Sequence, residues 1–484
     1  MPGVRPIEVP HRGPSPVRRC ALLLSGVLLA SCGAATPGPI VTGPVPQASC
    51  EGTGMGEHSY VTAVGADGRY FEDQHGTPLL VFGDSPWAGP VRWSPPQAEH
   101  YFANREAHGF NASIVSLIGS RANGGPGDDG RTHDGILPFV GGDVTRWNEP
   151  YWQRVDELVR AACAHGNTLF LYPIDGWTVS TVFRGAAPED AHRFGVMVAE
   201  RYARFPNIVW MTGGDHFPHD VTGRHDSPPE HDARFEQVLR GIRSTGDTRL
   251  FSIQLGYPAS VSTDSPMWEP HVDFNFVYTY LPTYRAVLDG HARDRRPALL
   301  MEANYEGENN LPGTPVTDDE VLRRQMGWAL TSGSPGYFYG SDDWELPPGW
   351  ETRLDTPAVG QLGRMREFFA ALPWWELAPV EPGEVIVAGR GEPVGSDAEV
   401  GVMADDHVTA ARTGDTLVAY VPTARTLTVD PATLAQPPTA RWVDAADATA
   451  PPVEARLDPP GAVTTPGRNA ADGEDWLLVL RLRS

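Results

Sequence analysis

The chain has 484 residues, 40% of them hydrophobic, and carries a formal net charge of −23 at pH 7. This length exceeds one ordinary domain, and so acidic a surface repels nucleic acid and anionic membranes, so neither is an expected partner. The sequence contains no lysine, so all 38 residues in the Lys and Arg count are Arg. Schiff-base chemistry and phosphate loops that need a lysine amine are therefore excluded.

The N-terminal segment is typical of an export signal. Arg18 and Arg19 precede an apolar stretch, residues 21–29, that is too short to span a bilayer as a permanent helix. Residues 29–33 read Leu-Ala-Ser-Cys-Gly, which resembles a bacterial lipobox in which Cys32 is lipidated. We therefore predict a lipoprotein signal peptide at 1–31 and a lipid anchor at the bacterial cell surface. A plain secretory peptide is the alternative, and export holds in both cases.

Residues 32–56 are rich in Pro, Gly, Ala and Thr, a composition that predicts a flexible tether. Apart from Cys20 in the leader and Cys32, the chain has two cysteines, Cys50 and Cys163. A disulfide between them would suit an oxidising compartment, but the spacing alone leaves the question open.

Eight apolar, strand-like runs follow the tether. They span residues 79–82, 112–118, 168–174, 207–211, 250–255, 274–280, 298–301 and 336–339. Helix start signals lie between them at 94–97, 148–150, 227–230 and 317–320, and helices are predicted over 151–165 and 357–372. Eight alternations of strand and helix predict the α/β class and a (β/α)8 TIM barrel over residues 57–373.

The composition changes after Pro373. Short alternating segments at 416–421, 425–429, 440–443 and 476–480 are separated by Pro, Gly and Asp. This pattern predicts a small all-β sandwich over residues 374–484. Because no long linker separates it from the barrel, we expect the two to pack together.

Two carboxylates stand at the ends of predicted strands. Asp215 follows the fourth strand and Glu302 ends the seventh, and the carboxyl ends of parallel barrel strands share the face that carries the chemistry. Cleavage of a glycosidic bond needs one carboxyl that protonates the leaving oxygen and one carboxylate that attacks the anomeric carbon or activates water. We assign Asp215 as the general acid/base and Glu302 as the nucleophile. Their separation decides between retention and inversion.

Structural alternatives remain for both acids. Asp215 is also compatible with a helix cap or an ion pair with Arg224, and Glu302 with an ion pair with Arg324. If the seventh strand is displaced by a few residues, the partner acid becomes one of two other glutamates. These are Glu269 and Glu306.

A metal site is a weaker interpretation. Residues 215–220, Asp-His-Phe-Pro-His-Asp, combine carboxylates and imidazoles that suit zinc. The first strand lacks the His-x-His of metal-dependent barrel hydrolases, so we expect neither a metal nor another cofactor.

Aromatic residues cluster after the same strand ends, and flat rings stack on the apolar faces of sugars. The predicted substrate-binding residues are Asp84, Trp87, Trp177, His216, Tyr257, Tyr280, Tyr305, Glu306 and Trp344. Any single ring is also compatible with packing, and Asp84 either binds a pair of sugar hydroxyls or caps a turn.

Several motifs together resemble the apiosidase-like glycoside hydrolases. The matching segments are 69–73 (Arg-Tyr-Phe-Glu-Asp), 76–78 (Gly-Thr-Pro), 83–87 (Gly-Asp-Ser-Pro-Trp), 109–111 (Gly-Phe-Asn), 206–210 (Pro-Asn-Ile-Val-Trp), 213–215 (Gly-Gly-Asp) and 302–306 (Glu-Ala-Asn-Tyr-Glu). The resemblance covers about residues 60–370. It implies catalysis by Asp215 and Glu302, a retaining mechanism, and release of apiose or a similar terminal sugar. The Gly-rich segment from 120 to 142 is expected to shape the pocket.

The C-terminal part is similar to the β-module that often follows this barrel and is named for a collagen-binding role. Residues 473–476, Gly-Glu-Asp-Trp, match it near the last strand. Residues 442–445, Trp-Val-Asp-Ala, depart from its usual Trp-x-Asp-Pro, so no binding role is carried over.

The leading prediction is an exported, surface-anchored, exo-acting glycosidase that acts as a monomer on a carbohydrate. Its contact with the membrane is expected through the lipid anchor only. The alternative is a non-catalytic carbohydrate-binding lipoprotein that passes sugars to a transporter. The presence of both carboxylates favours the enzyme.

Overall fold

The structure is a computed structural model, and it describes residues 50, 58–221, 227–395 and 399–483. All of these belong to one compact unit. The predicted signal peptide, Cys32, Arg224 and nearly all of the predicted tether lie outside the described residues. Among the helices of the described part, none is both long and apolar enough to cross a membrane.

All eight predicted barrel runs form strands of one sheet. In the described part these strands are β3 (Val81–Asp84), β4 (Ala112–Ser116), β5 (Thr168–Tyr172), β6 (Ile208–His216), β7 (Phe251–Leu255), β9 (Asn275–Thr279), β10 (Ala298–Glu302) and β11 (Gly336–Tyr339). They pair in parallel in the order β7-β6-β5-β4-β3-β11-β10-β9. An additional strand that the sequence did not predict, β8 (Ala259–Val261), pairs antiparallel with β9.

The sheet is nearly closed between β7 and β9, where a main-chain bond from the Asp273 N–H, just before β9, to the Phe251 carbonyl at 2.9 Å is supplemented by side-chain bonds. Ser252 Oγ donates to the carbonyl of Phe274 at 2.7 Å. Ser262 Oγ donates to the carbonyl of Ile253 at 2.7 Å and accepts the Phe276 N–H at 2.8 Å. These bonds bridge the seam, and the architecture is a TIM-like barrel.

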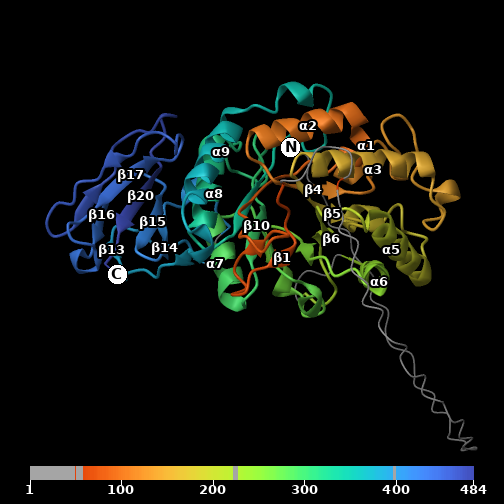
Figure 1. The fold of residues 1–484 in the computed structure, drawn as a ribbon, viewed down its shortest axis with the longest axis horizontal. Helices are drawn as coiled ribbons and strands as arrows, with labels where there is room; N and C mark the ends of the chain where they lie inside the picture. The colour runs from red at the N-terminus through yellow and green to blue at the C-terminus, as the bar shows by residue number, and fades with distance from the viewer. Residues whose placement is uncertain (1–49, 51–57, 222–226, 396–398, 484) are drawn as a thin grey trace, which may run out of the picture. The chain divides into compact units, whose positions relative to one another are not determined.

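Helices surround the strands, as Figure 1 shows for those it labels. Those that follow barrel strands are α2 (Pro95–Ala107), α3 (Glu149–Ala164), α5 (Pro188–Tyr202), α6 (Pro229–Ser244), α7 (Thr283–Arg293), α8 (Asp319–Leu330) and α9 (Pro357–Ala370). Two short helices, α1 (Gly89–Arg92) and α4 (Gly176–Val179), follow β3 and β5.

The predicted helix starts are correct to within about a residue. Ser94 and Gln97 form the predicted capping box of α2. The predicted start at 317–320 is displaced by one residue, because the Asp318 carboxylate accepts the N–H of Val321 and so caps α8. Pro228, rather than the expected Ser227, is the cap residue of α6.

The end of the barrel at which the strands begin is filled by aromatic side chains. A small antiparallel pair, β1 (Ala63–Val64) and β2 (Phe71–Glu72), precedes the first barrel strand. Phe71 is fully buried, and its ring lies edge-on to Phe274 at 5.3 Å, which in turn contacts Phe170 at 5.9 Å. The barrel interior is therefore a packed core.

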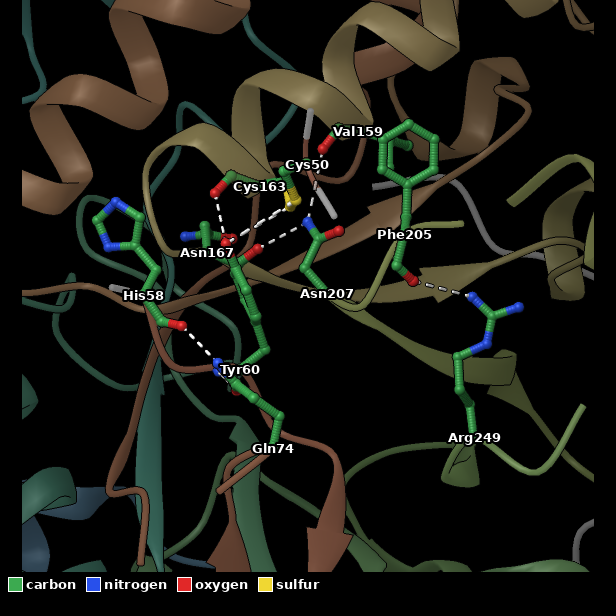
Figure 2. The surroundings of a disulfide bond; sticks show 10 residues. All are labelled: Cys50, His58, Tyr60, Gln74, Val159, Cys163, Asn167, Phe205, Asn207 and Arg249. Carbon is green, nitrogen blue, oxygen red and sulfur yellow. Dashed lines mark hydrogen bonds between the residues drawn. A yellow bond between two sulfur atoms is a disulfide. The ribbon is translucent and has the colours of Figure 1, made fainter. Parts of the chain in front are cut away.

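The question of the cysteine pair is decided by the structure: Cys50 and Cys163 form a disulfide (Figure 2). Cys163 lies in the last turn of α3, which leads into β5, so the bond sits at the end where the strands begin. The Tyr60 hydroxyl donates to the Cys163 carbonyl at 2.7 Å, and the Val61 N–H donates to Thr168 Oγ1 at 3.1 Å. The segment before β1 is thus fastened to α3 and β5.

The C-terminal region is all-β and contains two sheets in its described part. One has the order β12-β14-β15-β20-β17-β18 and the other β13-β16-β19. The predicted segments correspond to β15 (Thr416–Val421), β16 (Thr426–Val429), β17 (Ala440–Asp444) and β20 (Trp476–Arg481). The remaining strands, β12 (Ala378–Pro379), β13 (Ile386–Ala388), β14 (Thr409–Thr413), β18 (Val453–Glu454) and β19 (Ala462–Thr464), were not predicted.

This region contacts the barrel through α8. Arg323 on α8 binds Asp475 with two hydrogen bonds, Nε to Oδ2 at 3.0 Å and Nη2 to Oδ1 at 2.9 Å. Both side chains are buried, and Gln361 on α9 accepts from Arg323 at 2.5 Å. Trp328 Nε1 donates to the carbonyl of His407 at 2.8 Å. The expected packing of the two regions is confirmed.

Candidate active site

Asp215 lies in an irregular stretch of β6 with an unusual backbone. Gly213, Gly214 and Asp215 have successive φ values of 90°, 81° and 51°, and the register with β7 shifts between Gly213 and His216. A positive φ is rare for a residue with a side chain and is often retained at functional sites. A Cβ on Gly213 would lie 2.0 Å from the carbonyl oxygen of Gln254, so the bulge requires glycine there.

The loop after β5 packs directly on this bulge. A Cβ on Gly176 would lie 2.4 Å from the Gly214 carbonyl oxygen, and one on Gly214 would lie 2.9 Å from the Trp177 ring. The close backbone contact therefore depends on glycine at both positions. It also places the predicted sugar-stacking residue Trp177 beside the segment that carries Asp215.

Asp175 organises this side of the site. Its buried carboxylate caps α4 through the N–H groups of Trp177 and Thr178, and it accepts from Ser116 Oγ at 2.7 Å and Asn123 Nδ2 at 3.2 Å. Burial raises the pKa of Asp175 to about 6. The sequence analysis missed this residue, although its position, in Ile-Asp-Gly-Trp just after a predicted strand, was an available signal.

Glu302 is the last residue of β10, and its side chain is 7% exposed. Gln254 on β7 donates from Nε2 to Glu302 Oε2 at 2.5 Å. Tyr280 approaches the other oxygen, with its hydroxyl 3.5 Å from Oε1, and the Tyr278 hydroxyl donates to that of Tyr280 at 2.7 Å. The carboxylate is thus surrounded by hydrogen-bond donors.

The two predicted catalytic acids interact with each other. Burial, and after it the charge of Asp215, raises the pKa of Glu302 well above its usual value. Burial also raises the pKa of Asp215 to about 6, and the Tyr278 hydroxyl lowers the pKa of both acids. Asp215 Oδ1 is buried and has no hydrogen-bond partner among the described residues. Two adjacent carboxyls of this kind retain a proton near neutral pH, as acid/base chemistry requires.

The alternative partners for Glu302 lie elsewhere. Arg324 donates to the carbonyls of Asp405 and Pro422 and pairs with Glu320. The suggested ion pair between Glu302 and Arg324 is therefore wrong.

The two other glutamates do not replace Glu302. Glu306 accepts from the hydroxyls of Tyr339 at 2.6 Å and Thr356 at 2.9 Å. Glu269 is exposed in a short 3-10 helix that precedes β9, and so lies near the end of the barrel where the strands begin.

Three of the predicted aromatic residues lie together beside the acids. Trp87 Nε1 donates to the Tyr305 hydroxyl at 2.9 Å, and its ring centroid is 5.4 Å from that of Trp177. Trp87 and Tyr305 are buried, whereas Trp177 is partly exposed. Burial raises the pKa of Tyr305, with a further contribution from the charge of Glu302, which places this ring near Glu302.

Two other aromatic residues are more open. Tyr257 is 53% exposed, and its ring centroid is 6.2 Å from that of Tyr280. Trp344 is partly buried and donates from Nε1 to Glu308 at 2.7 Å. Glu308, which the sequence analysis missed, is close enough for its charge to contribute to the raised pKa of Glu302.

The three predicted polar contacts have partners within the protein. Asp84 accepts from the Tyr101 hydroxyl at 2.5 Å and lies 3.5 Å from Arg105 Nε. His216 Nε2 is 2.6 Å from Asp232 Oδ1, and Glu306 is bound by Tyr339 and Thr356 as described. Contact of these side chains with a substrate stays a prediction.

Comparisons with known proteins agree with this fold. A family model described as "Apiosidase-like, catalytic domain" matches residues 65–376, and one described as "Putative collagen-binding domain of a collagenase" matches residues 398–481. A crystal structure of a glycoside hydrolase family 5 protein from Bacteroides vulgatus has 20% identity and a TM-score of 0.71, over 87% of this chain and 93% of that one. Another structure, described as "Glycoside hydrolase", has 21% identity and a TM-score of 0.70, over 87% and 97% of the two chains. No curated protein matches the chain.

A TIM-like barrel that carries two interacting carboxyls on its fourth and seventh parallel strands, with the matching family model, defines a glycoside hydrolase. The structural neighbours support the fold alone at this level of identity. Because the family model covers more than half of the chain, the protein belongs to the apiosidase-like glycoside hydrolases.

Proposed function

We propose that the protein is an exo-acting, retaining glycosidase that removes apiose or a similar terminal sugar from a polysaccharide or glycoside. The observation that carries the proposal is the interaction between Asp215 and Glu302, two buried carboxyls whose pKa values are both raised, so that the pair keeps a proton at one site. The family match supports the sugar, and the resemblance supports retention. In this proposal the barrel is a (β/α)8 barrel, to which β8 adds one antiparallel strand, and the C-terminal region is a β-sandwich.

The hydrogen bonds around the two acids favour one reactive form of the pair. Gln254 donates to Glu302 and the Tyr280 hydroxyl lies beside it, and donors stabilise a carboxylate in its ionised form. Asp215 Oδ1 has no such donor among the described residues. The two acids hold one proton between them, and the mechanism uses the form in which Asp215 carries it and Glu302 is ionised.

Catalysis then proceeds in two steps. Asp215 gives its proton to the leaving oxygen while Glu302 attacks the anomeric carbon, so the glycosidic bond breaks and a covalent glycosyl ester forms. Asp215, now ionised, takes a proton from water, whose oxygen attacks the same carbon and releases Glu302. Two inversions give net retention.

The partly exposed aromatic residues support recognition of a carbohydrate. Trp177 lies beside the Asp215 segment, and Tyr257 lies beside Tyr280, which approaches the nucleophile. Rings in these places suit stacking on the two sides of the scissile bond. The remaining predicted contacts, including Asp84, His216 and Glu306, form part of the proposal on the sequence argument.

The test is a screen of the full-length chain, purified in detergent, against aryl pentosides and hexosides, apiosides among them, and against plant and bacterial polysaccharides. We expect release of a single terminal sugar, with the first-formed anomer retained in proton NMR. An inverted first product would reject the retaining mechanism. Sugar binding without any hydrolysis would favour the non-catalytic binding lipoprotein.

The location is a separate part of the proposal. The lipobox-like residues around Cys32 support a lipid anchor, and the Cys50–Cys163 disulfide supports folding in an oxidising compartment. Cell fractionation tests it: the protein should partition with membranes, and Cys32→Ala should release it or leave it unprocessed. Recovery of the unmodified chain from the cytoplasm would reject export.

A further inference from the structure

Gln254 on β7 is fully buried and bonded at both ends of its amide. Its Nε2 donates to Glu302 Oε2 at 2.5 Å, and its Oε1 accepts from the Tyr172 hydroxyl at 3.1 Å. Tyr172 belongs to β5, so the chain of hydrogen bonds runs across the interior from one barrel strand to another. It ends on the oxygen of Glu302 that is opposite the one near Tyr280.

The amide can adopt one useful orientation. A carboxylate accepts hydrogen bonds and does not donate them, so Nε2 has to face Glu302. The Tyr172 hydroxyl supplies the matching donor for Oε1. Burial, followed by the charge of Glu302, raises the pKa of Tyr172 well above its usual value, so this hydroxyl keeps its proton.

The backbone of Gln254 also contacts the segment that carries the acid. Gln254 is the register partner of Gly213 on β6, and its carbonyl oxygen lies where a Gly213 side chain would begin. The left-handed turn through Gly214 to Asp215 starts at this contact. Gln254 therefore contacts the nucleophile through its side chain and supports the acid/base segment through its main chain.

We propose that Gln254 is a positioning residue for the nucleophile, which holds Oε2 of Glu302, stabilises the ionised form of the carboxylate, and leaves Oε1 as the attacking oxygen. This inference rests on the proposed function. Gln254 takes no part in bond making. It acts on Glu302, and Tyr172 acts in turn by fixing the amide.

The first test compares Gln254→Leu with the natural chain on the best aryl glycoside from the screen. Hydrogen bonds to charged groups contribute about 1.5–3 kcal/mol, so we expect kcat to fall about 10- to 100-fold while KM changes little. Loss of the donor also raises the pKa of Glu302. The acid limb of the kcat/KM profile should therefore move to higher pH by about one unit.

Two further variants separate positioning from packing. Gln254→Glu keeps the shape but places a second carboxyl against Glu302, so activity should be lowest at neutral pH and recover toward acid pH, where the introduced carboxyl is protonated and can donate. Tyr172→Phe should lower kcat by less than Gln254→Leu, and the double variant should be no worse than Gln254→Leu alone. If the losses of kcat in the two single variants add in the double variant, Tyr172 does not act through Gln254.

The matched control is Gln361→Leu, which removes another buried glutamine, in the contact between α9 and α8. It should lower Tm and leave the pH profile in place. The inference is overturned if Gln254→Leu retains kcat within about two-fold and the acid limb does not move, while Glu302→Gln abolishes turnover. If Glu302→Gln is fully active, the proposed function itself fails. Should Gln254→Leu not fold, Gln254→Glu and Tyr172→Phe decide the question by the same profiles.

Discussion

Asp475 and the pair Asp215 and Glu302 are buried acids that differ in which partners stabilise their negative charge. Asp475, where the C-terminal region contacts α8, receives two hydrogen bonds from Arg323, one from Tyr420 and one from Asn469 at 2.7 Å. Asp215 and Glu302, at the carboxyl ends of the barrel strands, interact with each other and have neutral donors around them, and no ion pair to either is seen among the described residues.

The contrast separates stability from chemistry. A buried acid with a complete set of partners keeps its charge and holds two regions together. In the second case the charge of one acid, Asp215, raises the affinity of the other, Glu302, for a proton, and a pair of this kind suits the acid and base roles proposed for it. The left-handed backbone at Asp215 adds strain to this pair of acids.

The largest expected effect is on turnover. Glu302→Gln and Asp215→Asn should each reduce kcat by at least about 1,000-fold without loss of folding, because each removes a group that makes or breaks a bond. Steady-state kinetics with circular dichroism would check this. Glu269→Gln, which changes an exposed acid, is the matched control, and a comparable loss there would show that the acids are misassigned.

Asp475→Ala should instead act on stability. It leaves Arg323 buried without its partner, which typically costs about 3–5 kcal/mol, while kcat of the folded protein stays unchanged. Urea unfolding measures the effect, with Arg468→Ala in an exposed ion pair as the control that should cost less than about 1 kcal/mol. If Asp475→Ala also lowers the free energy of unfolding by less than about 1 kcal/mol, Asp475 does not stabilise the contact between the two regions.

A smaller effect links stability to pH at Asp215. Its pKa of about 6 exceeds the usual 3.8, so the folded state binds the proton more tightly and stability falls as pH rises from about 4 to 6. Asp215→Asn should therefore be more stable than the natural chain at pH 8, by up to about 2 kcal/mol, and gain nothing at pH 4. Thermal unfolding at both values tests this against Asp472→Asn, an exposed control. Equal gains at pH 4 and pH 8 would count against it.

The smallest effect is expected at the open edge of the site. Tyr257→Ala removes a ring that is 53% exposed, and loss of one stacking contact costs about 1 kcal/mol. KM should rise about five-fold while kcat changes less than two-fold. A fall in kcat with KM unchanged would place Tyr257 with the groups that act on the reacting bond.

Much of the barrel could be predicted because its strands are buried on both faces and read as continuous apolar runs. The missed strand β8 is three residues long and pairs with β9, a non-local contact that no short sequence window contains. The positions of Asp215 and Glu302 at the ends of barrel strands were predictable because each directly follows an apolar run, where a charged residue is costly to bury.

The residues that support the two acids were not predictable in this way. Gln254 lies inside an apolar run and reads as an ordinary strand residue, and its role exists only because β5, β7 and β10 meet in the closed barrel. Asp84 was ambiguous in the sequence, and its contacts with Tyr101 and Arg105 depend on how α2 packs.

The disulfide has a mechanical consequence. It clamps position 50 to the last turn of α3, at the end of the barrel remote from Asp215 and Glu302. A force applied through the residues before position 50 would act on this covalent bond and be transmitted to the junction of α3 and β5. The loops of the candidate active site would not carry this force, so Asp215 and Glu302 would keep their alignment when the N-terminal segment is under tension.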